Sequence, residues 1–266
     1  MRQMTEANLA YPVLVQIEGS SGTGFFLEKN NKTYFVTAKH VLCNNNSFKG
    51  NVANLTFQAR NSDPSIYFPM KLSLDLQLLL ADQHAAINPT RDIVVILIIG
   101  NNANEGEFVH PVRGINISGD SQGGFTRIPE ISIKQLSEVI IANDIFIFGY
   151  PVSIGLQNSP QFNYELPLTR KGVVSQVHAP NKTIILDCQV HPGNSGGPVI
   201  QVTNTGTHFQ YDVIGVLIQY VPYVTEINLG GAIYSYSGRS VNDFKNSGYS
   251  IAASMDLVLE TIDMLK

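Results

Sequence analysis

The first candidate for chemistry is a serine in a turn rich in glycine. Ser195 lies in the segment His191-Pro192-Gly193-Asn194-Ser195-Gly196-Gly197-Pro198. Glycines on both sides let the backbone bend sharply, so the hydroxyl of Ser195 can project into a cleft. The same bend can aim the backbone amides of Gly193 and Ser195 at one point, as an oxyanion hole requires. A hairpin turn without chemical function is the alternative.

Two residues upstream would complete a site for nucleophilic catalysis. His40 lies three positions after the end of a predicted strand over residues 33–37, where it can act as a general base, although an isolated histidine is more often an ordinary polar residue. Asp92 directly precedes an apolar strand over residues 93–98, where burying a carboxylate is costly unless it is hydrogen-bonded. A turn residue that starts the strand is the alternative for Asp92.

Other kinds of site find little support in the sequence. The six histidines show no metal-ligand spacing such as H-E-x-x-H, and the glycine-rich stretch 19–24 lacks the Lys-Ser/Thr pair of a phosphate-binding loop. We therefore expect no metal and no cofactor. Cys43 and Cys188 are the only cysteines, too few for a disulfide scaffold, and we expect both to be reduced.

Composition narrows the range of partners. The chain has 266 residues with 44% hydrophobic and 14% charged side chains, enough apolar residues for a substantial core. The net charge is −4 without a block of basic residues, so neither a nucleic-acid nor a membrane partner is expected. The longest apolar stretch, residues 93–99, is far shorter than the roughly 18 residues of a membrane span. No secretory signal is visible at the N-terminus, so we expect a cytoplasmic location.

Short β-strands must position the candidate residues. Apolar segments separated by Gly, Asn, Pro or Asp predict strands over residues 13–18, 24–28, 33–37, 55–59, 68–72, 76–81, 93–98, 144–148, 168–177, 183–188, 198–201, 211–218 and 249–253. Only the last segment reads as a helix, with Ser254 as its N-cap. A long insertion over residues 224–248 precedes the final strand.

This pattern predicts an all-β fold. We expect two antiparallel six-stranded-type β-barrels packed side by side, with a C-terminal α-helix. The whole chain, 1–266, would form a single domain with an N-terminal barrel at 12–100, a connection at 101–140, a C-terminal barrel at 141–253 and the helix at 254–266.

The sequence resembles the chymotrypsin-fold, or trypsin-like, serine peptidases. Their catalytic residues follow the same order, His then Asp then Ser, which differs from that of the subtilisins and α/β-hydrolases. The resemblance is closest to the HtrA-type protease domain and extends over residues 13 to 260. It rests on motifs that occur in the family's order: 22–26, 34–41, 148–151, 169–175, 213–216 and 248–252. We expect no PDZ domain after the terminal helix.

The resemblance implies a serine endopeptidase that acts on polypeptides. Ser195 would be the nucleophile, His40 the general base and Asp92 the residue that orients the imidazole, while the amides of Gly193 and Ser195 would bind the oxyanion. The substrate pocket would be lined by Val190, His191, Leu217, Ile218, Gln219, Ile251 and Ala252. Because this set holds no carboxylate, we expect an aliphatic residue at P1, the substrate residue before the cleaved bond.

Two other functions remain open at this point. A catalytically silent, protease-like binding module would keep the fold without hydrolysing peptides. An unrelated β-rich structural protein would use the glycine-rich turn only as a turn. The co-occurrence of His40, Asp92 and Ser195 in their expected surroundings argues against both, because neither role requires all three residues.

Overall fold

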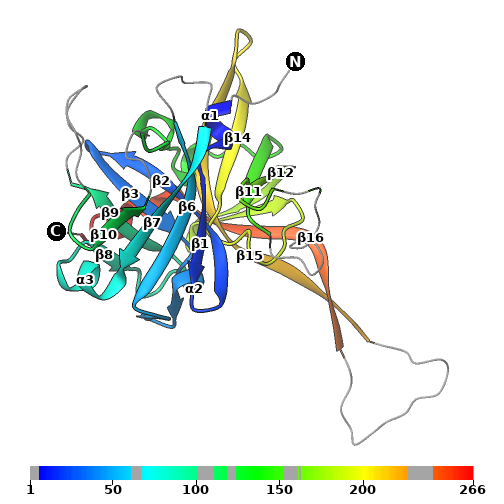
Figure 1. The fold of residues 1–266 in the computed structure, drawn as a ribbon. Coiled ribbons are helices and arrows are strands. Elements are labelled where there is room, and N and C mark those ends of the chain that lie inside the picture. The colour runs from blue at the N-terminus through cyan, green and yellow to red at the C-terminus, as the bar shows by residue number, and fades with distance from the viewer. Residues whose placement is uncertain are drawn as a thin grey trace, which may run out of the picture.

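Two β-structures, an eight-stranded sheet and a closed six-stranded barrel, make up most of the protein (Figure 1). The computed structural model describes residues 6–60, 67–100, 111–118, 124–151, 161, 163–226 and 242–265. All strand pairs within the two structures are antiparallel. The expectation of an all-β, chymotrypsin-like double-barrel fold is therefore confirmed.

The N-terminal half forms the sheet, with strand order β10-β7-β6-β1-β2-β3-β9-β8. Its strands are β1 Pro12–Ile17, β2 Ser20–Lys29, β3 Lys32–Thr37, β6 Val52–Arg60, β7 Tyr67–Asp75, β8 Ala85–Ile87, β9 Val94–Ile99 and β10 Ile115–Ser118. Two short strands, β4 Cys43–Asn44 and β5 Ser47–Phe48, pair separately. The first half thus has eight strands in its main sheet rather than six. The added strands β8 and β10 have three and four residues, too few to show an alternating pattern in the sequence.

The C-terminal half closes into the barrel β11-β12-β13-β16-β15-β14. Its strands are β11 Asp144–Gly149, β12 Leu168–His178, β13 Thr183–Asp187, β14 Pro198–Asn204, β15 Phe209–Glu226 and β16 Asn242–Ser254. In the predicted connection, β10 pairs with β7, and two 3₁₀-helices, η1 Glu130–Ser132 and η2 Leu136–Glu138, follow. Another 3₁₀-helix, η4 Ala179–Asn181, joins β12 to β13. The stretch 101–140 is therefore more than a connection, because one of its segments belongs to the first sheet.

The central strands of the first sheet separate two hydrophobic cores. In β2, Phe26 packs into the core of the first sheet, whereas its neighbours Phe25 and Leu27 pack into a core shared by both halves. Side chains alternate in the same way from Val94 to Ile98 in the fully buried strand β9. A third core fills the closed barrel. Burial on both faces explains why these strands read as continuous apolar runs rather than as alternating ones.

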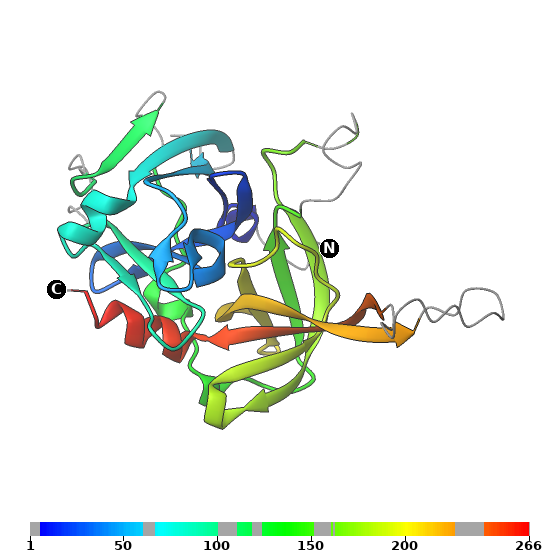
Figure 2. The same ribbon diagram turned by 90° about the horizontal axis from the view of Figure 1, so that it is seen from below.

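In the described ranges, four α-helices complete the fold: α1 Glu6–Leu9, α2 Lys39–Leu42, α3 Leu76–Ala81 and α4 Met255–Ile262. The predicted terminal helix is present as α4, whose residues Met255, Leu257, Val258 and Ile262 pack into the shared core. Figure 2 shows α4 directly after β16, beside the first sheet.

The strand expected over residues 76–81 is wrong, because this segment is the helix α3. The side chain of Asp75 caps it by accepting a hydrogen bond from the amide of Leu78 at 3.0 Å. Leu76 and Leu79 are buried, and their spacing of three residues places them on one helix face. A run of leucines fits both a strand and a helix, and the cap decides between them here.

The insertion over residues 224–248 is partly strand. β15 and β16 extend their pairing out to Glu226 and Asn242, forming a two-stranded arm that projects from the barrel (Figure 1). The part of the insertion between these residues lies outside the described residues. Among the helices that the structure describes, none is long and apolar enough to span a membrane.

Candidate active site

His40 and Asp92 meet because of the pairing between β3 and β9. Thr37 at the end of β3 pairs with Val94 at the start of β9. His40, three positions after Thr37, therefore faces the loop just before β9, and this loop carries Asp92. His40 Nδ1 lies 2.7 Å from Asp92 Oδ2, and the backbone amide of His40 donates to Asp92 Oδ1 at 2.8 Å. Both carboxylate oxygens of Asp92 thus form hydrogen bonds with His40.

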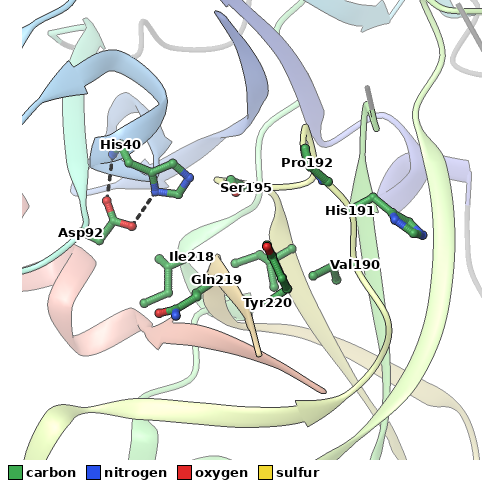
Figure 3. A pocket seen from close by; sticks show the side chains of 10 residues that line it. His40, Asp92, Val190, His191, Pro192, Ser195, Ile218, Gln219 and Tyr220 are labelled. Atoms are coloured by element: carbon green, nitrogen blue, oxygen red, sulfur yellow. Dashed lines mark hydrogen bonds and ion pairs between the residues drawn. The ribbon is translucent and has the colours of Figure 1, made fainter. Parts of the chain in front are cut away.

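Figure 3 shows the imidazole ring of His40 between Asp92 and Ser195. With Nδ1 directed at the carboxylate, Nε2 is the ring nitrogen available for chemistry. No hydrogen bond joins His40 to Ser195 among the described residues. In unliganded enzymes such a contact is often long and tightens only when the substrate binds. The arrangement can supply a general base next to a serine hydroxyl.

The loop that carries Asp92 is organised by a residue that the sequence reading missed. Asn88 is buried, and its Oδ1 accepts the backbone amide of Arg91 at 2.9 Å. Its Nδ2 donates to Thr261 Oγ1 in α4 at 2.9 Å, and its carbonyl accepts from Lys39 Nζ at 2.8 Å. The pair Asn88-Pro89, typical of turn initiation, is the signal that could have pointed to this loop.

The nucleophile loop is a sequence of tight turns. The backbone amide of Asn194 donates a hydrogen bond to the carbonyl of His191 at 3.0 Å, which closes a β-turn with Pro192 and Gly193 at its centre. Gly193 has φ +96, as the third position of a type II turn requires. Gly196 has φ +86, and a Cβ there would lie 2.0 Å from the carbonyl oxygen of Thr23. Conformation therefore requires a glycine at position 193, and both conformation and close packing require one at position 196.

The backbone amides of Gly193 and Ser195 have no acceptor among the described residues. Their neighbours are all engaged: the Gly196 amide donates to the carbonyl of Leu217 at 2.7 Å, and the Gly197 amide donates to that of Asn194 at 3.1 Å. Two free amides beside a serine hydroxyl can stabilise an oxyanion.

Ser195 opens into a pocket of about 430 Å³. Its lining consists of His40, Asp92, Val190, His191, Pro192, Ser195, Leu217, Ile218, Gln219 and Tyr220 (Figure 3). The structure thus brings together His40, Asp92, Ser195 and five of the seven residues expected in the substrate pocket.

Ile251 and Ala252, the other two, are not among the lining residues. Ala252 is fully buried in the core of the closed barrel, and as its neighbour on β16, Ile251 points to the opposite face. Tyr220 lines the pocket although it was not expected there. Register shifts in β15 after Leu217 and after Tyr220 change which side chains face the site, and no local sequence signal marks them.

The pocket wall is mainly apolar and carries little charge. Asp92 is the only carboxylate that lines it, and His40 engages both of its oxygens. Burial, with a smaller contribution from Arg170, lowers the pKa of His191, which favours a neutral imidazole in the wall. The described part of this wall therefore offers no free acid to a basic side chain.

The two cysteines are buried, unpaired thiols. Burial raises the pKa of both Cys43 and Cys188 to about 11, so neither is an activated nucleophile at neutral pH. Within the described ranges, no group of three or more His, Cys, Asp or Glu side chains is arranged to hold a metal ion.

Comparisons with known proteins concern the family and the fold of the chain. Residues 22–207 match the sequence model of the trypsin-like peptidase domain. The crystal structure of Deg5 is similar with a TM-score of 0.52 and 15% identity, covering 97% of this chain and 90% of that one.

Two further solved structures show a weaker likeness. The HtrA-type protease AlgW, solved with a tripeptide, has a TM-score of 0.48 and 15% identity, over 96% of this chain and 59% of AlgW. The protease Anisep from Arthrobacter nicotinovorans has a TM-score of 0.47 and 14% identity, over 95% of this chain and 94% of that one. No curated protein sequence matches. Because the family model matches well over half of the sequence, the chain belongs to the trypsin-like peptidase family.

Proposed function

We propose that this protein is a serine endopeptidase that cleaves polypeptides through an acyl-enzyme. The observation that carries the proposal is the His40–Asp92 pair, which lies in one pocket with Ser195. The two free amides of the nucleophile loop support it further. The proposal requires no metal or cofactor.

In the first half-reaction, Ser195 Oγ forms a bond to the scissile carbonyl carbon while its proton passes to His40 Nε2. Asp92 holds the imidazole in the tautomer that accepts this proton and stabilises the imidazolium that results. The amides of Gly193 and Ser195 bind the oxyanion, and loss of one such donor typically lowers the rate about 10²- to 10³-fold. When the C–N bond breaks, His40 returns the proton to the leaving amine.

In the second half-reaction, water takes the place of the amine. His40 removes a proton from the water as the oxygen attacks the acyl carbon, and the proton then passes to Ser195 Oγ as the ester bond breaks. The products are a carboxylic acid and the free enzyme. The same groups thus act twice, in opposite directions.

The pocket favours an aliphatic side chain at P1. Val190, Leu217 and Ile218 supply apolar surface, and burying a side chain of the size of valine or leucine contributes about 1.5–3 kcal/mol. A lysine or arginine would lose hydration without finding a free carboxylate. We propose Val, Ala, Leu or Ile at this position.

A fluorophosphonate probe tests the proposed function, because it reacts only with an activated serine. We expect the wild type to be labelled and to hydrolyse a denatured protein substrate, and Ser195→Ala to lose both activities while keeping its fold. Asp92→Asn should lower kcat about 10⁴-fold, since the imidazole is no longer held in the correct tautomer. The exposed ion pair Lys171–Asp144 offers a matched control, Asp144→Asn, which should leave kcat unchanged.

A folded wild type that is neither labelled nor active on any polypeptide would exclude this function. That outcome would favour the alternative, a catalytically silent binding module that retains the peptidase fold.

A further inference from the structure

Thr23 in β2 contacts the nucleophile loop from the opposite half of the molecule. Its side chain is fully buried, and its hydroxyl donates to the carbonyl of Gly193 at 2.7 Å. Its backbone amide donates to the carbonyl of Ser195 at 2.8 Å. One residue of the first sheet thus binds two carbonyls of the loop that carries the serine.

These two bonds fix the peptide groups on either side of a catalytic one. The carbonyl of Gly193 belongs to the peptide group that links it to Asn194, and the carbonyl of Ser195 belongs to the group that links it to Gly196. Between them lies the peptide group whose N–H is the Ser195 amide. Since both flanking groups are held by Thr23, the direction of the Ser195 amide is restricted.

The hydroxyl of Thr23 makes two hydrogen bonds at once. It accepts the backbone amide of Tyr150 at 3.1 Å while it donates its proton to the Gly193 carbonyl. From the other side, Thr37 Oγ1 donates to the carbonyl of Thr23 at 2.6 Å. The threonine is therefore itself held in place by β3 and by the residue after β11.

We propose that Thr23 is a positioning residue for the oxyanion hole, which it orients across the boundary between the two halves. It touches neither the substrate nor the reacting atoms. The inference rests on the proposed function, because it assigns the loop geometry to catalysis. It also predicts a change in the loop that can be measured without any substrate.

The test compares two buried threonines of the first sheet. Thr23→Val keeps the shape of the side chain but leaves the Gly193 carbonyl and the Tyr150 amide without their partner. Thr33→Val is the matched control, since Thr33 is equally buried and Arg127 Nη1 donates to its hydroxyl at 3.4 Å. Thr33 pairs with Ile99, at the end of β9 away from Asp92. Thr23→Ser retains the hydroxyl and should restore the wild-type behaviour.

We expect Thr23→Val to lower kcat about 10- to 100-fold with little change in KM, less than the loss of an oxyanion donor itself. Inhibition by a peptidyl trifluoromethyl ketone, whose adduct with serine carries an oxyanion, should weaken by a similar factor. Thr33→Val should change neither quantity, even if both variants lower the unfolding temperature equally.

Equal kcat values and equal ketone inhibition for the two valine variants would overturn the inference while leaving the proposed function intact. If the wild type proves inactive, hydrogen exchange of the peptide spanning residues 189–198 still decides. Faster exchange in Thr23→Val than in Thr33→Val supports the positioning role, and equal exchange excludes it.

Discussion

The side-chain amide of Asn88 donates a hydrogen bond to the hydroxyl of Thr261 at 2.9 Å, which fastens the loop carrying Asp92 to the C-terminal helix α4. Both side chains are buried. Thr261 Oγ1 donates in turn to the carbonyl of Leu257 one turn earlier, at 2.6 Å. The last helix of the chain is thus part of the structure that holds the carboxylate next to His40.

Thr261→Val should therefore affect both stability and activity. It removes the acceptor of Asn88 from a buried site, for which we expect a loss of about 1–3 kcal/mol in the free energy of unfolding. We also expect kcat to fall several-fold, since the loop before Asp92 loses a fixed point. Urea unfolding and steady-state kinetics measure the two effects, and Thr261→Ser should restore both. A destabilised Thr261→Val with wild-type kcat would show that α4 does not position Asp92.

Substrate preference should follow the apolar pocket wall. On a library of peptides that differ at P1, we expect Val, Ala, Leu and Ile to exceed Arg and Lys in kcat/KM by 10-fold or more, the range that pocket contacts of about 1–3 kcal/mol produce. Dominant cleavage after Arg or Lys would contradict this assignment.

Tyr220 should limit the size of the P1 residue, because its side chain lines the pocket. Its exposed fraction is 40%. Tyr220→Ala should raise kcat/KM for Phe at P1 relative to Val. Tyr223→Ala removes an even more exposed tyrosine, one that does not line the pocket, and should leave this ratio unchanged. If both variants shift the ratio alike, the effect comes from the arm and not from the pocket.

The free energy of unfolding should decrease as the pH is lowered through a range set by His191. Burial, followed by the charge of Arg170, lowers its pKa below the ordinary value of about 6.5, so the unfolded chain binds the proton more tightly than the folded one. The stabilisation that comes from a neutral His191 is thus complete above about pH 6.5. It is lost as the pH falls toward the pKa of His191 in the folded protein, which is the lower of the two. Urea midpoints between pH 5 and 8 should decline less in His191→Gln than in the wild type. Identical slopes in His191→Gln and wild type would contradict the prediction.

Activation by N-terminal cleavage is not expected, because the residue before Ser195 is neutral. Asn194 is buried, and its Oδ1 accepts the amide of His191 at 3.1 Å within the loop itself. The position before Ser195 thus offers no carboxylate to pair with a newly formed terminal ammonium. Trimming the chain to begin at Tyr11 should leave activity at or below that of the full chain. Active-site titration measures this, and an increase after trimming would contradict the prediction.

Asn194→Asp would test how a negative charge at this position affects stability. A carboxylate there would be buried without a cation, so we expect a loss of about 2 kcal/mol or more in the free energy of unfolding, growing as the pH rises and the group ionises. An aspartate that left stability unchanged from pH 4 to 8 would show that the loop can accommodate the charge.

Most of the strands could be predicted from the sequence because their signal is local. Side chains that alternate between two apolar cores leave runs such as that of β9, which need no tertiary information to be read. Local sequence signals gave the wrong prediction at α3, because its run of leucines fits the periodicity of a strand as well as that of a helix. The N-cap from Asp75 favours the helix. Strands of three or four residues, β8 and β10, are held by their partners and show no pattern of their own.

The sequence by itself nominated His40, Asp92 and Ser195, because each stands at a recognisable local feature: the end of a strand, the start of one, or a turn built from glycines. Tertiary structure decided how these features meet. The register Thr37↔Val94 brings the first two within 2.7 Å, and this is a property of strand pairing between residues more than fifty positions apart. The side chains of the pocket wall, Tyr220 among them, lie next to register shifts in β15. Thr23 reaches the nucleophile loop only because the two halves pack together. Such contacts arise from chain segments that are distant in sequence, so no local pattern of residue types can specify them.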